Sequence, residues 1–228
     1  MRISERVLAI DCATPALSLA LFEGALEGAT CLATFHQEIG RGHAEALLPA
    51  IAALPEGGRC DRILVNLGPG SFTGVRVGIA AATGLGFAWG IPVQGYGCLD
   101  LVAAMAHERF GTQEPFAVVM VGGHGELFWS VPAAPSGADA APAQVRSTPI
   151  AQLAAMLDVN RIVGSGAHAL VDARGGRGEA IPLLPDARAL PLLPAGQRNR
   201  PPRPDYGRGA DAQPMAMRAR SSPPVPAS

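Results

Sequence analysis

The stretch RILVNLGPGSFTGVRVG constrains the fold more than any other part of this chain of 228 residues. It begins with a continuous apolar run, which is typical of a strand buried on both faces of a parallel sheet. Gly68-Pro69-Gly70 ends the run, and Ser71 is a suitable N-cap for a helix that we expect from about Ser71 to Trp89. A buried strand that leads directly into a long helix indicates an α/β protein.

The flanking segments extend this pattern to a βββαβαβα order over residues 1–112. Two apolar runs around a polar turn at Asp11 to Pro15 predict a strand and an antiparallel return strand, and residues 29–37 predict a third. Residues 42–54 have helical spacing around Pro49, which predicts a helix with a bend or a restart. Three meandering strands followed by parallel strands joined by helices resemble a ribonuclease-H-like half.

The remaining sequence predicts a smaller second lobe, residues 113–181, and a tail, residues 182–228. FAVVMV and ELFWSVP predict a hairpin, and a helix with Thr148 as its N-cap and a further strand follow. The tail holds eleven of the 21 prolines, and seven arginines against three aspartates. This composition buries little apolar surface, so we expect much of the tail to be extended or disordered.

Composition excludes several kinds of site. All 18 basic residues are arginines, so neither a P-loop lysine nor a Schiff-base lysine exists, and a net charge of −1 gives no general signal for nucleic acid. Four widely spaced cysteines without a C-x-x-C pair indicate buried free thiols and a cytoplasmic protein. The uncharged run from Val77 to Leu99 contains six glycines and a proline, which favours a buried helix, turn and strand over a membrane span.

The turn at Gly68 to Ser71 is a candidate anion site, because the first N–H groups of a helix can receive an anion. Its spacing matches neither common phosphate motif, since lysine is absent and Thr73 stands where G-x-G-x-x-G requires glycine. Asp11 is either a ligand for hydrated magnesium or a turn-capping carboxylate. A vestigial nucleotide or anion site would comprise Asp11, Thr14, Gly68, Gly70 and Ser71.

A stripe of small residues runs along the helix that follows this turn. Gly74, Gly78, Ala82 and Gly86 recur every four residues and leave one face almost without side chains. Each interior glycine costs roughly 1 kcal/mol relative to alanine, so the bareness indicates close approach of another backbone. That neighbour is either a helix or strand of the same domain, or a helix of another protein.

Three stretches resemble a known family. LAIDCATPALSLALFEG, HAEALLPAIAAL and LGPGSFTGVRVGIAAATGLGFAWGIPVQGYGCLDLVA are similar to segments of the bacterial TsaB (YeaZ) proteins, and GPGSFTGVR is close to diagnostic. The resemblance implies an actin-like, two-lobed fold. It also implies a non-catalytic partner of the transferase TsaD in making N6-threonylcarbamoyladenosine at position 37 of tRNA, with the ATPase TsaE joining the pair.

The resemblance further implies which residues meet the partner. The family presents the helices at 42–54 and 71–89 to TsaD, so the expected interface residues are His43, Leu47, Leu48, Ile51, Gly74, Arg76, Gly78, Ala82 and Gly86. Catalytic relatives carry a histidine pair after the glycine helix, whereas Cys98 to Val102 contains no histidine. We therefore expect no catalytic residue, no metal ligand and no cofactor of its own, with ATP and magnesium at the complex interface at most, and a homodimer when TsaD is absent.

Two other classes of function remain open at this point. One is an ATP-binding or hydrolytic, peptidase-like enzyme of the actin fold, which would use Asp11, Thr14 and the turn at Gly68 to Ser71. The other is direct tRNA binding by the arginine-rich residues 196–228, since arginines neutralise RNA phosphates.

Overall fold

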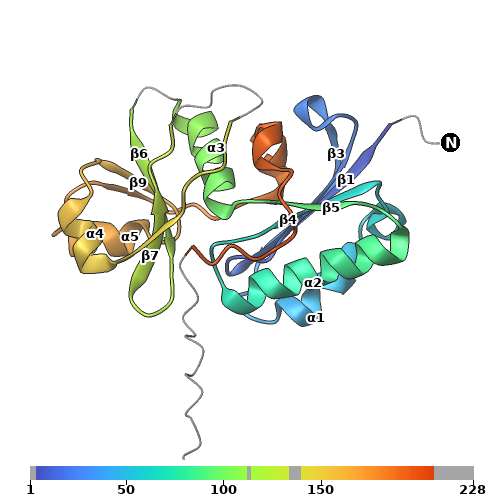
Figure 1. Cartoon of the computed structure of the whole chain (residues 1–228), viewed down its shortest axis with the longest axis horizontal. Helices are drawn as coiled ribbons and strands as arrows, with labels where there is room; N and C mark the ends of the chain where they lie inside the picture. Colours follow the sequence, from blue (N-terminus) through green and yellow to red (C-terminus); the bar gives the residue numbers. More distant parts are fainter. Residues whose placement is uncertain (1–3, 112–113, 134–139, 208–228) are drawn as a thin grey trace, which may run out of the picture.

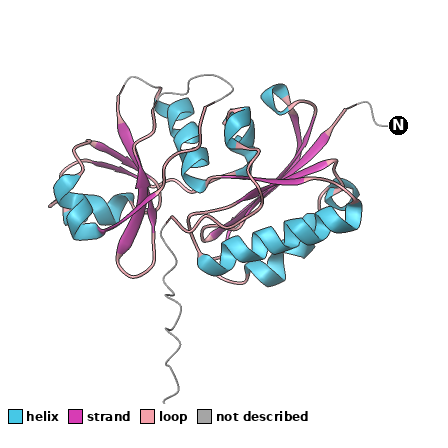
Figure 2. Ribbon diagram, in the orientation of Figure 1, coloured by secondary structure: helices cyan, strands magenta, loops and turns pink. Residues whose placement is uncertain are grey.

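The computed structural model describes residues 4–111, 114–133 and 140–207. These residues form two lobes, each built on a five-stranded mixed sheet with helices packed against it (Figures 1 and 2). The first lobe has the βββαβαβα order that the sequence predicts, interrupted only by short 3₁₀ helices.

The first sheet has the strand order β3-β2-β1-β4-β5. β1 (Arg6–Asp11), β2 (Ala16–Glu23) and β3 (Thr30–Glu38) form an antiparallel meander. β4 (Arg62–Asn66) lies parallel to β1, and β5 (Val93–Tyr96) lies parallel to β4. Almost every residue of β1, β2 and β4 is buried, which explains why their sequences are continuous apolar runs.

Helices cover both faces of this sheet (Figure 1). α1 (His43–Ala52) and α2 (Phe72–Trp89) lie together on one face, and α3 (Cys98–Phe110) lies on the other. The Oγ atom of Ser71 accepts the N–H of Gly74 at 3.2 Å, which confirms Ser71 as the N-cap.

α1 runs through Pro49 without a break, so the predicted restart of this helix does not occur. Leu47 and Ile51 on either side of the proline are buried in the core. Their packing holds the helix together although proline removes one backbone hydrogen bond.

The sheet of the second lobe has the strand order β10-β9-β6-β7-β8. Read in reverse, this order repeats that of the first sheet, because the first strand of the lobe (β6) lies in the centre, the second and third lie to one side of it and the fourth and fifth lie to the other. Its strands are β6 (Phe116–Val121), β7 (Glu126–Ser130), β8 (Arg146–Pro149), β9 (Arg161–Val163) and β10 (Glu179–Ile181). Its helices are α4 (Ile150–Met156) and α5 (Ala167–Ala173). The predicted β6–β7 hairpin is confirmed.

The predicted N-cap role of Thr148 is wrong. Thr148 belongs to β8, and its Oγ1 atom accepts the indole N–H of Trp129 at 3.0 Å. α4 begins after Pro149 without a side-chain cap. The buried indole therefore takes the hydroxyl that the helix would have used.

Residues 187–193 pack against the first lobe, so the expectation of an extended or disordered tail is wrong for these residues. Two 3₁₀ helices, η3 (Ala187–Leu192) and η4 (Ala195–Gln197), follow β10. Leu190 and Leu193 are buried in a cluster with residues of β1, β2, β4 and β5. The leucines between the prolines supply the apolar surface that composition alone does not reveal, and residues 208–228 of the predicted tail lie outside the described ranges.

Residues 200–207 form a strap that crosses from the first lobe to the second. Arg200 and Gly95 exchange two backbone hydrogen bonds, of 2.7 and 3.1 Å, at the free edge of β5. Further along, the N–H of Asp205 donates to the carbonyl oxygen of Leu67 at 2.7 Å. Gly207 then packs against Phe128 of the second lobe. The strap is the red segment that passes between the sheets in Figure 1.

Cys12, Cys60 and Cys98 are buried and form no disulfide, as expected, whereas Cys31 on the edge strand β3 is exposed and corrects the expectation for that residue. Within the described ranges, no helix combines the length and the apolar character that a bilayer crossing requires.

Candidate functional site

The five residues of the predicted anion site come together where β1 and β4 end. The turn after β1 packs directly on the turn before α2, because the N–H of Ser71 donates to the carbonyl oxygen of Ala13 at 2.7 Å. Gly68 joins the same junction through its N–H, which donates to Oδ1 of Asn66 at 2.8 Å. Thr14 is buried and accepts the N–H of Ala16 at 3.3 Å.

Hydrogen bonds to the side chain of Asp11 hold this junction together inside the protein. Its carboxylate is completely buried; Oδ2 accepts Nδ2 of Asn66 at 2.5 Å and Oδ1 accepts the N–H of Ala13 at 3.0 Å. Desolvation raises the pKa of Asp11 to about 7, against the lowering effect of these two hydrogen bonds. Both carboxylate oxygens are thus engaged inside the protein, and the turn-capping role is the one that the structure supports.

The junction is closed by the backbone of the chain itself. A Cβ atom added at Gly70 would collide with the carbonyl oxygen of Ala13, and one at Gly68 would lie 2.8 Å from the carbonyl oxygen of Asp205 in the strap. The described residues also contain no group of three or more histidine, cysteine, aspartate or glutamate side chains placed to hold a metal ion. These residues therefore do not fit a magnesium–nucleotide site.

The small-residue stripe of α2 faces the sheet of its own lobe. A Cβ atom at Gly74 would collide with the carbonyl oxygen of Cys12, and one at Gly86 would collide with the side chain of Val93. Gly78 faces the side chain of Cys12, and Ala82 is completely buried. The prediction that Gly74, Gly78, Ala82 and Gly86 contact a partner protein is therefore wrong, because β1, β4 and β5 already occupy this face.

Three of the predicted interface residues on α1 are buried as well. His43 is 8% exposed, and its Nε2 atom lies 3.4 Å from the carbonyl oxygen of Ala16. Leu47 and Ile51 belong to the main apolar core. These three predictions are wrong for the same reason, and only Leu48, which is 52% exposed, and Arg76 remain at the surface.

The opposite side of α2 carries a second small-residue surface. Ala80, Thr83, Gly84 and Phe87 are exposed and follow one another at helical spacing; we call them the outer face of α2. Phe87 is 91% exposed, and a Cβ atom at Gly84 would meet nothing within 4 Å. The sequence analysis did not predict this surface. Gly84 was the available signal, because it lies outside the four-residue period of the stripe and therefore on another face of the helix.

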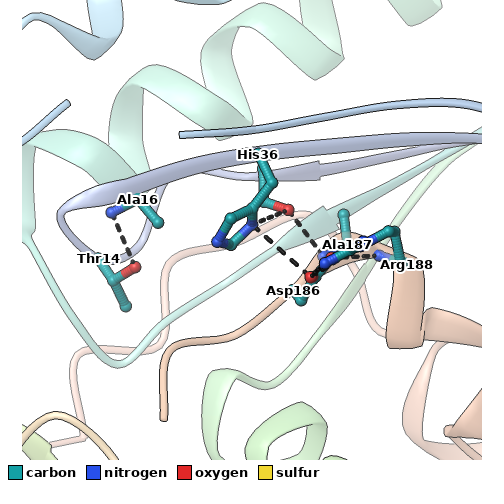
Figure 3. A network of polar contacts seen from close by, with 7 residues as sticks. Thr14, Ala16, His36, Asp186, Ala187 and Arg188 are labelled. Carbon is teal, nitrogen blue, oxygen red and sulfur yellow. Dashed lines mark hydrogen bonds and ion pairs between the residues drawn. The ribbon is translucent and has the colours of Figure 1, made fainter. Parts of the chain in front are cut away.

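A serine, a histidine and an aspartate meet at β2, β3 and the C-terminal segment (Figure 3). Nδ1 of His36 lies 2.9 Å from Oγ of Ser18 and 3.9 Å from Oδ2 of Asp186. A catalytic triad needs the serine and the carboxylate on different ring nitrogens. Here both lie at Nδ1, and Oγ of the completely buried Ser18 accepts the N–H of Ala187 at 2.9 Å.

This network therefore fastens the C-terminal segment to the sheet and does not form a hydrolytic site. Burial acts to raise the pKa of Asp186, but hydrogen bonds from Arg188 outweigh it and hold the pKa below its ordinary value. Nε of Arg188 donates to Oδ1 of Asp186 at 3.0 Å and Nη2 donates to Oδ2 at 2.5 Å, and this bidentate pair keeps the carboxylate charged beside His36.

The chain is similar to one protein family and to several known proteins. Residues 33–147 match the family model described as TsaD, tRNA N6-adenosine threonylcarbamoyltransferase. An uncharacterized protein of Mycobacterium tuberculosis is 30% identical over 200 residues, which cover 86% of this chain and 80% of that protein. The tRNA threonylcarbamoyladenosine biosynthesis protein TsaB of Escherichia coli is 33% identical over 131 residues, 55% of this chain and 54% of that protein.

The structure of YeaZ from Pseudomonas aeruginosa superposes with a TM-score of 0.63 at 27% identity, covering 81% of this chain and 88% of that one. This chain belongs to the TsaB (YeaZ) family. The resemblance read from the sequence is thereby confirmed, and so is the two-lobed actin-like fold. Within this TsaB-family chain, the junction formed by the five residues of the predicted anion site is closed, and the outer face of α2 is open.

Proposed function

We propose that this chain is a non-catalytic partner subunit of TsaD, which it scaffolds and activates in the threonylcarbamoylation of adenosine 37 of tRNA. Two relatives, from Escherichia coli and Bacillus subtilis, carry the name tRNA threonylcarbamoyladenosine biosynthesis protein TsaB. The closed junction supports a non-catalytic role, because the Asp11 carboxylate is completely buried and both of its oxygens accept hydrogen bonds from within the chain.

The outer face of α2 is the observation that carries the proposal. An almost fully exposed phenylalanine beside alanine, threonine and glycine leaves an apolar surface that a second helix can approach closely. Leu48 on the adjacent helix α1 adds a half-exposed apolar side chain. We assign TsaD to this surface, and a second copy of this chain when TsaD is absent.

The other components follow from the same proposal. TsaE joins the assembled pair, tRNA reaches the chain through the complex, and ATP and magnesium bind at the complex interface and not in the closed junction. The two lobes of this chain then serve as a rigid platform for α1 and α2, since one apolar core continues from the first lobe into the second.

Co-purification with TsaD from the same source tests the docking surface. Ala80→Arg places a long charged side chain in the middle of the outer face, so we expect it to abolish the complex. Ala155→Arg introduces the same charge on an exposed position of α4 in the second lobe and should leave the complex intact. Both positions are exposed, so both variants should melt within about 2 °C of the parent chain. An unchanged complex with Ala80→Arg would contradict the proposal.

A threonylcarbamoyl transfer assay tests the role. The chain alone should give negligible transfer, and its addition to TsaD, TsaE, ATP and tRNA should raise the rate. Calorimetry with ATP and magnesium should give no heat of binding for the isolated chain. Micromolar binding that disappears with Asp11→Ala would instead favour an ATP-using enzyme.

A further inference from the structure

A cluster of aromatic and arginine side chains lies where the strap crosses the start of α2. The rings of Phe72 and Tyr206 are stacked, with centroids 5.4 Å apart and 27° between their planes. The guanidinium carbon of Arg76 lies 3.5 Å from the centroid of Phe72, and its Nε donates to the hydroxyl of Tyr206 at 2.8 Å. We call these three residues the Arg76 shelf.

The shelf is at the surface. Phe72 is 56% exposed and Tyr206 is 36% exposed, so neither ring is needed to fill the core. The Nε atom of Arg76 is the one that bonds Tyr206, which leaves the two Nη groups of the guanidinium directed away from that bond. An ordered pair of exposed rings with a guanidinium fixed over one of them is a preorganised binding surface.

Tyr206 of the shelf lines an open hollow of about 550 Å³, whose other lining residues are Val145 of the second lobe and strap residues 200, 201, 203–205 and 207. Asp205 neutralises one of the two strap arginines, since its Oδ2 atom accepts from Arg200 at 2.8 Å. Within the described ranges, neither Arg203 nor Arg76 forms an ion pair with a carboxylate. Two uncompensated positive charges therefore flank Tyr206 on a chain whose net charge is −1.

Guanidinium groups and exposed ring faces together match the chemistry of unpaired RNA. A guanidinium fork binds phosphate oxygens in pairs, and unstacked bases pack on aromatic rings or on guanidinium planes. An acidic peptide would satisfy the arginines but would leave the stacked rings unused. We infer that the Arg76 shelf and Arg203 bind single-stranded RNA, with phosphates on the two arginines and a base on Tyr206.

Only the identity of the natural RNA rests on the proposed function. If the chain is a partner of TsaD, that RNA is the tRNA substrate of the complex. It differs from binding by the arginine-rich tail as a whole. The contact is made by α2 and by the part of the chain that the strap places beside it, and the docking surface for TsaD lies further along the same helix.

Fluorescence anisotropy with the isolated full chain tests the inference. The probe is a labelled RNA hairpin with an unpaired loop; a fully paired RNA duplex with the same number of nucleotides and a polyglutamate peptide serve as competitors. Arg76→Gln combined with Arg203→Gln should weaken hairpin binding about tenfold or more and reduce the salt slope by about 1.4, the value for two phosphate contacts. Arg177→Gln, an exposed arginine of the second lobe, is the control for loss of charge and should leave both quantities unchanged.

A second pair of variants separates stacking from charge. Tyr206→Ala should weaken loop binding about tenfold, whereas Tyr206→Phe keeps the ring and should retain most of the affinity. Equal losses of affinity in the Arg177→Gln control, unchanged affinity in the double variant, or stronger competition by polyglutamate than by the RNA duplex would each overturn the inference. Ala80→Arg should bind RNA normally, so failure of the TsaD interface and failure of the RNA site give different results.

Discussion

Substituting alanine for two glycines of α2 distinguishes the inner face of this helix from its outer face. At Gly74 the added methyl group would lie well under 3.0 Å from the carbonyl oxygen of Cys12, and this backbone atom cannot rotate away. At Gly84 the same methyl group would meet nothing within 4 Å. The two substitutions are chemically identical, so any difference in stability reports what covers each face.

The expected effects have opposite signs. Overpacking against a backbone atom costs about 1–3 kcal/mol or more, and at Gly74 this cost exceeds what alanine gains in helix propensity. Gly84→Ala should gain about 1 kcal/mol, because alanine replaces an interior glycine in open space. The gain in helix propensity is common to both variants, so they differ by the overpacking cost; at roughly 2–4 °C in Tm for each kcal/mol in a chain of this size, the two melting temperatures should differ by about 2–12 °C. Thermal melting followed by circular dichroism measures the difference, and a Gly74→Ala variant as stable as Gly84→Ala would refute the assignment of the stripe to the internal sheet.

Three further predictions follow from buried groups. Burial raises the pKa of Asp11 from 3.8 to about 7, so the contribution of the protonated group to stability is fully present below about pH 4 and is lost by the time the pH has risen through about 7; Asp11→Asn should therefore flatten the decrease in Tm between about pH 4 and about pH 7, and identical pH profiles would contradict this. Thr148→Val should cost about 1–3 kcal/mol in urea unfolding, because it leaves the indole N–H of Trp129 without its acceptor, whereas Thr148→Ser should cost much less. Leu190→Ala should destabilise the chain by about 2–5 kcal/mol and Leu192→Ala, at a position 41% exposed, by well under half of that; equal effects would show that residues 187–192 do not pack on the first lobe.

The order of elements in the first lobe could be predicted because each one carries a local signal. The apolar runs of β1 and β4, the N-cap Ser71 and the glycine-rich turns all fix structure over a few residues. Thr148 shows where local signals fail. Its sequence neighbours predict a cap, but an indole nineteen positions earlier competes for the same hydroxyl, and only the three-dimensional pairing of β7 with β8 brings the two together.

The candidate site was harder to predict than the fold. The four-residue period of the stripe correctly identifies a bare face, but a period cannot tell whether the chain itself or another protein covers that face. Gly74 and Gly86 turned out to face the internal sheet, whereas Gly84, outside the period, faces outward. Composition failed in a similar way for residues 187–193, because proline and arginine content hides the position of Leu190 and Leu193, whose burial depends on contacts with strands far away in sequence.

The packing of Leu190 and Leu193 also determines when the first lobe can be completed during synthesis. Val7, Leu64 and Tyr96 belong to a cluster whose other members include these two leucines. The ribosome synthesises these leucines long after β1, β4 and β5, so the nascent first lobe must expose this apolar surface until they emerge. Contacts of such long sequence separation slow folding, and a chain cut before residue 187 would leave part of the face beside α3 uncovered.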